Sequence, residues 1–120
     1  MLPGSEGIVV LCCGGRDYEN ELRAIEVLSD LPPESVVVHG DAPGADRLSR
    51  DVALALGHRH RPYPADWDAY GLAAGFLRNQ QMLDENPDIS LAIAFPGGKG
   101  TADMCRRLVK AGIPIIYVTD

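Results

Sequence analysis

The stretch Ile89-Ser-Leu-Ala-Ile-Ala-Phe-Pro-Gly-Gly-Lys-Gly-Thr-Ala-Asp103 joins an apolar run to a glycine-rich turn and then to a helical pattern. Glycine lets backbone N–H groups come close to a ligand, and the first turn of a helix carries free N–H donors at a positive dipole end. A strand, a turn and a helix start in this order predict a site for a phosphate-sized anion. The alternative is a structural turn in which Thr101 serves as the helix N-cap.

Two phosphate-binding motifs are excluded by the spacing of this turn. Lys99 is followed by Gly100, whereas a Walker A loop requires Ser or Thr there. A dinucleotide fingerprint would place its third glycine at Asp103, and the turn comes late in the chain. The turn therefore belongs to neither motif.

Five short apolar runs alternate with helical patterns along the rest of the chain. The runs are Ile8–Cys12, Val36–His39, His58–Tyr63, Leu91–Phe95 and Ile113–Val118. Near-continuous Val, Ile and Leu residues are typical of strands buried on both faces of a parallel sheet. The apolar positions that mark the four helical patterns are Leu22, Ile25 and Leu28, then Leu48, Val52, Ala55 and Leu56, then Leu72, Phe76, Leu77 and Leu83, then Cys105, Leu108 and Val109.

This alternation predicts an α/β fold for residues 1–120, as one domain. Right-handed crossovers favour a three-layer sandwich, with a five-stranded parallel sheet in the order 3-2-1-4-5 and helices on both faces. Ligands of such sheets bind at the carboxyl ends of the strands where the order reverses, here between strands 1 and 4. The loops Gly14–Asp17 and Pro96–Thr101 meet at that crevice, and the loop 39–46 borders it.

The charge balance limits the classes of partner. Seventeen acidic and 11 basic residues give a net charge of −6, which disfavours sequence-independent binding to nucleic acid. The basic residues that could form local patches are Arg59, Arg61, Arg106, Arg107 and Lys110. The run 58–61 is interpreted as a charged edge strand that blocks edge-to-edge pairing, with a nucleic-acid patch as the alternative.

Cysteine usage and the N-terminus indicate a cytoplasmic protein. Cys12, Cys13 and Cys105 are an odd number without zinc spacing, which suits free thiols in a reducing compartment. We see no signal peptide and no apolar stretch long enough to span a membrane. No metal is predicted, because His39 with its neighbouring aspartates matches no ligand spacing. Cys13 ends a strand near the crevice, but no His stands nearby in the sequence to activate it as a nucleophile.

Five motifs in fixed order resemble a known group of proteins. They are Cys13–Tyr18, His39–Asp46, Tyr63–Trp67, Ala74–Met82 and Phe95–Met104. They are similar to the small stand-alone members, of bacterial or phage type, of the YspA/YpsA-related branch of the SLOG superfamily. This superfamily joins the Lonely Guy phosphoribohydrolases to the DNA-processing protein Smf/DprA. The resemblance spans Val9 to Val118 and implies a Rossmann-like fold with a site for nucleotides or nucleotide-derived ligands.

The chain departs from the Lonely Guy pattern at two positions. Those enzymes carry Arg-Lys-x-x-Met and then Pro-Gly-Gly-x-Gly-Thr-x-x-Glu, whereas Asn79 and Met104 stand at the Lys and Glu positions here. A carboxylate stabilises an oxocarbenium-like state or activates water, and methionine does neither. The catalytic candidates are therefore Arg78 and Asp103, although Asp103 is turned by about 100° around the helix. The sequence does not choose among the crevice-loop carboxylates Asp17, Asp41, Asp46 and Asp66.

Backbone amides, the Thr101 hydroxyl and the Arg78 guanidinium are the expected phosphate contacts. Lys99 either neutralises the phosphate or points to solvent, and Trp67 either stacks on a base or anchors its loop. The glycines of the first turn could instead form only a strand–helix turn capped by Asp17. The full predicted ligand-binding set is Gly14, Gly15, Arg16, Gly40, Asp41, Gly44, Asp46, Arg78, Asn79, Pro96, Gly97, Gly98, Lys99, Gly100 and Thr101.

The sequence thus predicts a protein that binds a nucleotide or nucleotide-derived phosphate, of the AMP or ADP-ribose kind, as a sensor or carrier. Hydrolysis of the N-glycosidic bond of a nucleoside monophosphate is the first alternative, and handling of single-stranded DNA is the second. No cofactor is firmly implied beyond a nucleotide ligand. No membrane partner is expected, nucleic acid is disfavoured, and a homodimer or higher homo-oligomer is left open.

Overall fold

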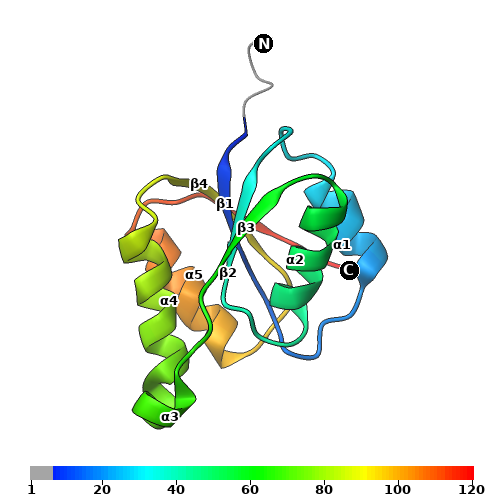
Figure 1. The fold of residues 1–120 in the computed structure, drawn as a ribbon. Coiled ribbons are helices and arrows are strands. Elements are labelled where there is room, and N and C mark those ends of the chain that lie inside the picture. The colour runs from blue at the N-terminus through cyan, green and yellow to red at the C-terminus, as the bar shows by residue number, and fades with distance from the viewer. Residues whose placement is uncertain (1–6) are drawn as a thin grey trace.

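A computed structural model describes residues 7–120 (Figure 1), so residues 1–6 of the predicted domain lie outside the described part of the chain. Strands and helices alternate along it. The strands are β1 Val9–Cys13, β2 Val36–His39, β3 Arg59–Pro62, β4 Ile89–Ala94 and β5 Ile115–Tyr117. The helices are α1 Glu21–Leu28, α2 Ala45–Ala55, α3 Trp67–Tyr70, the 3-10 turn η1 Gly71–Ala73, α4 Ala74–Glu85 and α5 Lys99–Lys110.

The sheet has the predicted topology. Its order is β3-β2-β1-β4-β5, and all four pairings are parallel. β1 lies in the centre, with Leu11 paired to Val38 of β2 and to Ala92 of β4. The order reverses between β1 and β4, so their carboxyl ends leave the crevice in which open α/β sheets bind ligands.

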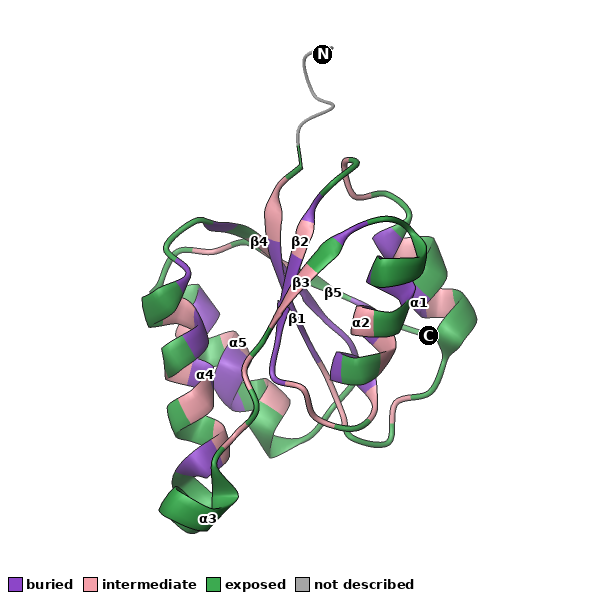
Figure 2. Ribbon diagram, in the orientation of Figure 1, coloured by how far each residue is buried: buried purple, intermediate pink, exposed green. Residues whose placement is uncertain are grey.

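Helices cover both faces of the sheet, and each face has its own apolar cluster. Successive strand residues point to opposite faces, so Val10 and Cys12 pack toward α1 and α2, whereas Leu11 and Cys13 pack toward α4 and α5. Figure 2 shows the buried central strands between the two helical layers. The Rossmann-like three-layer sandwich is therefore confirmed.

The third helical pattern is the main difference from the sequence prediction. It is divided into α3, η1 and α4, and Gly71 adopts a positive φ of 57° at the break. Leu72 is 93% exposed, and Phe76 and Leu77 also face outward. The inner face of α4 is formed by Ala74, Asn79 and Met82 instead. The prediction was wrong for Leu72, Phe76 and Leu77, whereas Leu83 packs against the core as predicted. Spacing reveals a helix but does not say which of its faces meets the sheet.

The charged edge strand is confirmed. β3 pairs with β2 on one side only, and Arg61 donates to Asn86 Oδ1 at 2.8 Å and forms an ion pair with Asp88 at 3.2 Å. These contacts tie the strand to the loop before β4 and leave its outer edge charged, which discourages pairing with another sheet. Within residues 7–120, no helix has both the length and the apolar character needed to cross a bilayer.

Candidate functional site

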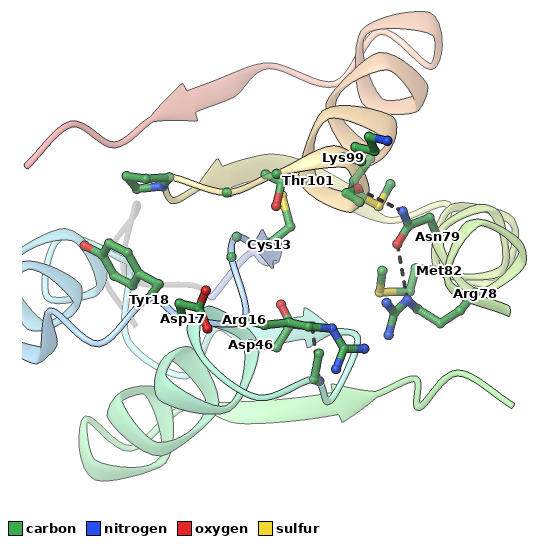
Figure 3. Close-up of a pocket in the computed structure, with 18 residues that line it drawn as sticks. Cys13, Arg16, Asp17, Tyr18, Asp46, Arg78, Asn79, Met82, Lys99 and Thr101 are labelled. Atoms are coloured by element: carbon green, nitrogen blue, oxygen red, sulfur yellow. Dashed lines mark hydrogen bonds between the residues drawn. The ribbon is translucent and has the colours of Figure 1, made fainter. Parts of the chain in front are cut away.

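A cleft of about 600 Å³ opens at the carboxyl ends of β1 and β4, where the strand order predicts a ligand site (Figure 3). Twelve of the predicted ligand-binding residues line it: Gly14, Gly15, Arg16, Asp46, Arg78, Asn79, Pro96, Gly97, Gly98, Lys99, Gly100 and Thr101. The remaining lining residues are Cys13, Asp17, Tyr18, Ala42, Met82 and Met104. Gly40, Asp41, Gly44, Trp67 and Asp103 are not among its lining residues.

The two glycine-rich turns touch each other at the base of the cleft. Gly15 N donates to Pro96 O at 2.9 Å. A Cβ added at Gly97 would collide with the Thr101 hydroxyl and lie 2.7 Å from Gly15 N, closer than real Cβ contacts come. Glycine is needed at position 97 because the first turn and helix α5 both press against it.

Helix α5 begins in the cleft without a side-chain cap. Its N-cap is Gly98, and the first helical backbone bond runs from Ala102 N to Gly98 O at 3.0 Å. The preceding N–H groups, of Lys99, Gly100 and Thr101, are the ones that a helix leaves without an internal partner. Thr101 lies inside the helix, so its predicted alternative role as N-cap is wrong; its side chain lines the cleft instead. The helix start supplies donors and a positive dipole end for an anion.

The loop after β2 packs against the first glycine-rich turn, Gly14–Arg16. Gly44 adopts a φ of 82°, and an added Cβ would collide with the carbonyl oxygens of Gly15 and Arg16. Ala45 N donates to Gly15 O at 3.0 Å. Asp41 accepts from Arg47 and Arg50 at 3.4 Å each. Gly44 and Asp41 therefore shape the site from outside the cleft. The N-cap of α1 is Asn20, so the alternative in which Asp17 caps that helix is also wrong.

Asp46 brings a buried carboxylate to the cleft. It lies in the first turn of α2, is only 6% exposed and lines the cavity. Its Oδ2 accepts from Ala42 N at 3.3 Å. Burial raises the pKa of Asp46 to about 6, against the opposing effects of the Ala42 N–H and of the Arg78 charge. Asp46 is the one crevice-loop carboxylate that is buried and also faces the cleft; Asp17 lines the cleft but is exposed.

Arg78 forms a fixed positive wall on the α4 side. Its Nη1 donates to Gly40 O and, at 3.3 Å, to Tyr63 O, and its Nε donates to Asn79 Oδ1 at 3.2 Å. Among residues 7–120, Nη2 makes no hydrogen bond. Burial lowers the pKa of Arg78, while the nearby Asp46 raises it, and a guanidinium stays charged at any physiological pH.

Asn79 connects Arg78 to the glycine-rich turn. Its Nδ2 donates to Gly100 O at 3.2 Å and to Asp103 Oδ2 at 3.1 Å. Arg107 Nε also donates to Asp103 Oδ2, at 2.7 Å. Burial raises the pKa of Asp103, but the hydrogen bonds from Arg107 and Asn79 outweigh it, so this pKa lies below its usual value. Asp103 is thus an ionised partner within the α4–α5 interface rather than a group that faces the cleft.

Trp67 lies next to the cleft rather than in its lining. It starts helix α3, is 45% exposed, and its ring centroid is 5.4 Å from the Arg16 guanidinium carbon. This is the distance range of a cation–π contact. The contact places Trp67 beside a cleft-lining arginine, and a role in stacking on a base stays a prediction.

Three residues that line the cleft were not predicted from the sequence: Tyr18, Ala42 and Met82. Tyr18 donates to Asp120 Oδ1 at 2.9 Å and its ring centroid is 4.9 Å from that of Phe95, while Ala42 and Met82 complete the wall. Tyr18 and Met82 end two of the quoted motifs, which is the signal that could have found them.

Cys13 is a neutral thiol in the lining of the cleft. A hydrogen bond with Cys105, the largest cause, and burial, the second, raise the pKa of Cys13 well above its usual value.

The His39 side chain accepts a hydrogen bond from the backbone of the loop that precedes Asp46. Its Nδ1 accepts from Asp41 N at 3.0 Å, so Nε2 carries the proton and donates to His60 Nδ1 at 2.9 Å. Burial, with the charge of His60, lowers the pKa of His39 to about 4. The ring is therefore a neutral structural element. Residues 7–120 contain no group of three or more His, Cys, Asp or Glu side chains arranged to hold a metal ion.

Similar solved structures share the fold. DNA processing protein A (DprA) from Streptococcus pneumoniae superimposes with a TM-score of 0.76 at 17% identity, over 97% of this chain and 52% of the DprA chain. The chain therefore spans about half of that protein. The C-terminal domain of a hydrogenase from Pyrococcus furiosus gives a TM-score of 0.50 at 17% identity, over 99% of this chain and 96% of the domain. At these identities the likeness shows the fold alone.

Sequence comparisons are more specific. The Gene 61 protein of Mycobacterium phage D29 is 35% identical over 120 residues, which cover 92% of this chain and 96% of the phage protein. The family model described as YAcAr, the YspA, cpYpsA-related SLOG family, matches residues 8–70, just over half of the chain. The matched region contains β1, β2 and the two loops that follow them, with Asp46 and the first glycine turn. The chain belongs to the YspA, cpYpsA-related SLOG family.

Proposed function

We propose that the cleft binds the phosphate group of a nucleotide or nucleotide-derived ligand, and that the protein acts as a sensor or carrier of it. The observation that carries this proposal is the uncapped start of α5, whose first N–H groups lie at the cleft beside the turn Gly14–Arg16. Such a helix start binds anions through free donors and its dipole.

The cleft supports the proposal by its charge and its size. Arg16, Arg78 and Lys99 line it, although the whole chain has a net charge of −6. A volume of about 600 Å³ lies in the range of pockets that hold ligands of nucleotide size. A local positive site in an acidic protein favours a small anion over a nucleic-acid strand, which requires a long basic surface.

The residues at the two positions expected to supply a catalytic carboxylate, Met104 and Asp103, favour binding of the ligand without its hydrolysis. The carboxylate expected from the Lonely Guy resemblance is replaced by Met104, whose apolar side chain is buried in the floor. Asp103 is occupied by Arg107 and Asn79. Glycosidic hydrolysis needs a carboxylate at the glycosidic bond itself, and neither position supplies one.

A thermal-unfolding screen with AMP, ADP, ADP-ribose, NAD, GMP and ribose 5-phosphate tests the proposal. At least one compound is expected to raise the melting temperature, and chromatography after incubation is expected to return it intact. Release of free base would make the protein an N-glycosidic hydrolase. No shift with any of the six compounds would contradict the phosphate site itself.

Two substitutions locate the binding. Arg78→Gln removes the positive wall and is expected to abolish the ligand-induced shift. Arg59→Gln is the matched control, because Arg59 is exposed on the edge strand β3, away from the cleft. An equal loss of the shift in both variants would show that binding depends on overall charge rather than on the cleft.

A further inference from the structure

Asp46 and the exposed Asp17 are the two carboxylates that line a cleft in which Arg16, Arg78 and Lys99 suit an anion. Asp46 is only 6% exposed, yet it lines the cavity. Figure 3 shows its side chain on the wall opposite the start of α5. A phosphate at the two glycine turns would be repelled by this carboxylate if it approached closely. Asp46 therefore faces a different part of the ligand.

Hydroxyl groups are the ligand chemistry that fits Asp46. An ionised carboxylate only accepts hydrogen bonds, and its two oxygens can accept from two neighbouring donors. Within the protein, Oδ2 receives the Ala42 N–H at a long 3.3 Å, and the Gly40 N–H also acts on this carboxylate. A ligand that carries vicinal hydroxyls beyond its phosphate would bring neutral donors to this carboxylate, and such charge-assisted bonds are short and strong.

The surroundings of Asp46 are arranged to keep this carboxylate near the cleft. A Cβ added at Gly40 would collide with Arg78 Nη1 and lie 2.8 Å from Asp46 Oδ2, so the absence of a side chain there lets both groups approach. The charged and titratable groups around Asp46 are Arg78 from α4, Arg16 from the first turn, and the thiols of Cys12 and Cys13 from β1. The Ala42 N–H and the Gly40 N–H both act on this carboxylate, as do the charges of Arg78 and Arg16.

We propose that Asp46 is a specificity-determining residue that accepts hydrogen bonds from vicinal hydroxyls of the ligand, so that the cleft selects ribosyl phosphates over their 2-deoxy analogues. This inference rests on the proposed function and names its ligand class, the phosphate esters of ribose. Free ribose 5-phosphate and a ribonucleotide such as AMP share this chemistry.

Calorimetric titration tests the selection with two matched pairs: ribose 5-phosphate against 2-deoxyribose 5-phosphate, and AMP against dAMP. The wild-type protein is expected to bind the ribo compound of at least one pair about tenfold more tightly. Asp46→Asn is expected to reduce this ratio to within about twofold of one, with the larger loss of affinity for the ribo compound, because the deoxy compound offers Asp46 only one of the two hydroxyls. The pair with the higher affinity distinguishes a sugar phosphate from a nucleotide.

The pH dependence adds a second readout. Protonation of a carboxylate removes its charge, so the ribo-to-deoxy ratio is expected to fall as the pH is lowered from 7.5 to 5. The ratio, rather than either affinity, is compared because both ligands' phosphates also titrate in this range. Asp46→Asn is expected to give a ratio that does not change with pH.

Asp51→Asn is the matched control. It makes the same change on the same helix at an exposed side chain, and the wild-type ratio is expected to persist. Equal binding of the ribo and deoxy compounds by the wild type would overturn the role of Asp46 and leave the phosphate site standing. Equal loss of both affinities in a folded Asp46→Asn protein would also overturn it. If none of the four compounds binds, this inference is overturned, whereas the proposed function fails only if none of the six compounds of the unfolding screen binds.

Discussion

At the scale of single residues, Gly97 is the position where the two halves of the site depend on each other most closely. Its Cα lies against Thr101 of α5 and Gly15 of the first turn. Gly100 has no neighbour within 4 Å of an added Cβ and lies in the first turn of a helix. The two glycines therefore separate a packing requirement from the general effect of adding a methyl group.

Gly97→Ala is expected to destabilise the protein by about 1–3 kcal/mol, because overpacking forces the backbone to shift. Gly100→Ala is expected to be neutral or to stabilise it by up to about 1 kcal/mol, because alanine is the better helix former. Urea unfolding of the two variants measures both effects. Equal stability of Gly97→Ala and the wild type would show that the turns do not press together as described.

At the scale of elements, the loop after β2 carries two groups whose titrations oppose each other. His39 has a pKa lowered to about 4, so its neutral folded form contributes stability above the unfolded pKa of about 6.5, which is lost as the pH falls toward 4. Asp46 has a pKa raised to about 6, so the folded protein binds its proton more tightly and gains stability as the pH falls from 6 toward 3.8. The two trends partly cancel in the wild type.

Asp46→Asn is expected to remove the titration of Asp46 and to leave that of His39. The variant is expected to be more stable than the wild type at pH 7.5 by about 2 kcal/mol, because a raised pKa marks an unfavourable buried charge. Its stability is then expected to fall more steeply between pH 6.5 and 4.5, where His39 and His58, whose pKa burial also lowers, act unopposed. Urea unfolding at several pH values measures the slopes, and parallel wild-type and variant curves would contradict the assignment.

The contact between α4 and α5 depends on Asn79. Its amide bridges Arg78, Gly100 O and Asp103, so Asn79→Ala leaves a buried network with missing partners. A loss of about 1–3 kcal/mol is expected. Gln81→Ala is the control, because Gln81 is exposed on the same helix. A loss in Asn79→Ala no greater than that in Gln81→Ala would indicate that the bridge does not stabilise the interface.

The elements differ in how far the sequence determines them. Four of the strands follow from apolar runs, because buried parallel strands have a strong signal, whereas β3 is a charged edge strand with only a weak signal. The strand order follows from handedness. The boundaries move by one or two residues: β4 starts at Ile89, because this residue pairs with Val9 despite the polar Ser90 that follows. The inward face of α4 was not predictable, because its buried positions include the polar Asn79, which tertiary partners satisfy.

Part of the candidate site is also predictable from the sequence, and part of it is not. The glycine turns are predictable because anion sites built from backbone have a recognisable spacing. The burial of Asp46, the pairing of Asp103 with Arg107, and the place of Trp67 beside Arg16 depend on contacts between residues distant in sequence or on helix faces. The choice of Asp46 among the crevice-loop aspartates therefore came from the structure.

At the scale of the whole molecule, a chain with a net charge of −6 has a cleft lined by three cationic side chains and two carboxylates. Binding of an anion there stabilises the folded state by an amount that grows with the ligand concentration, about 2.7 kcal/mol at one hundred times the dissociation constant. For a domain of this size each kcal/mol raises the melting temperature by several degrees. The acidic surface repels an anion, so the effect depends on the cleft residues.

The most direct test of the anion site is a ¹⁵N–¹H NMR titration of the wild-type protein with AMP. The largest shifts are expected on the backbone amides of Gly98, Lys99, Gly100 and Thr101, with smaller shifts at the turn Gly14–Arg16, because these N–H groups are expected to meet the phosphate. The absence of amide shifts at saturating AMP, or shifts confined to residues away from the start of α5, would contradict the anion site.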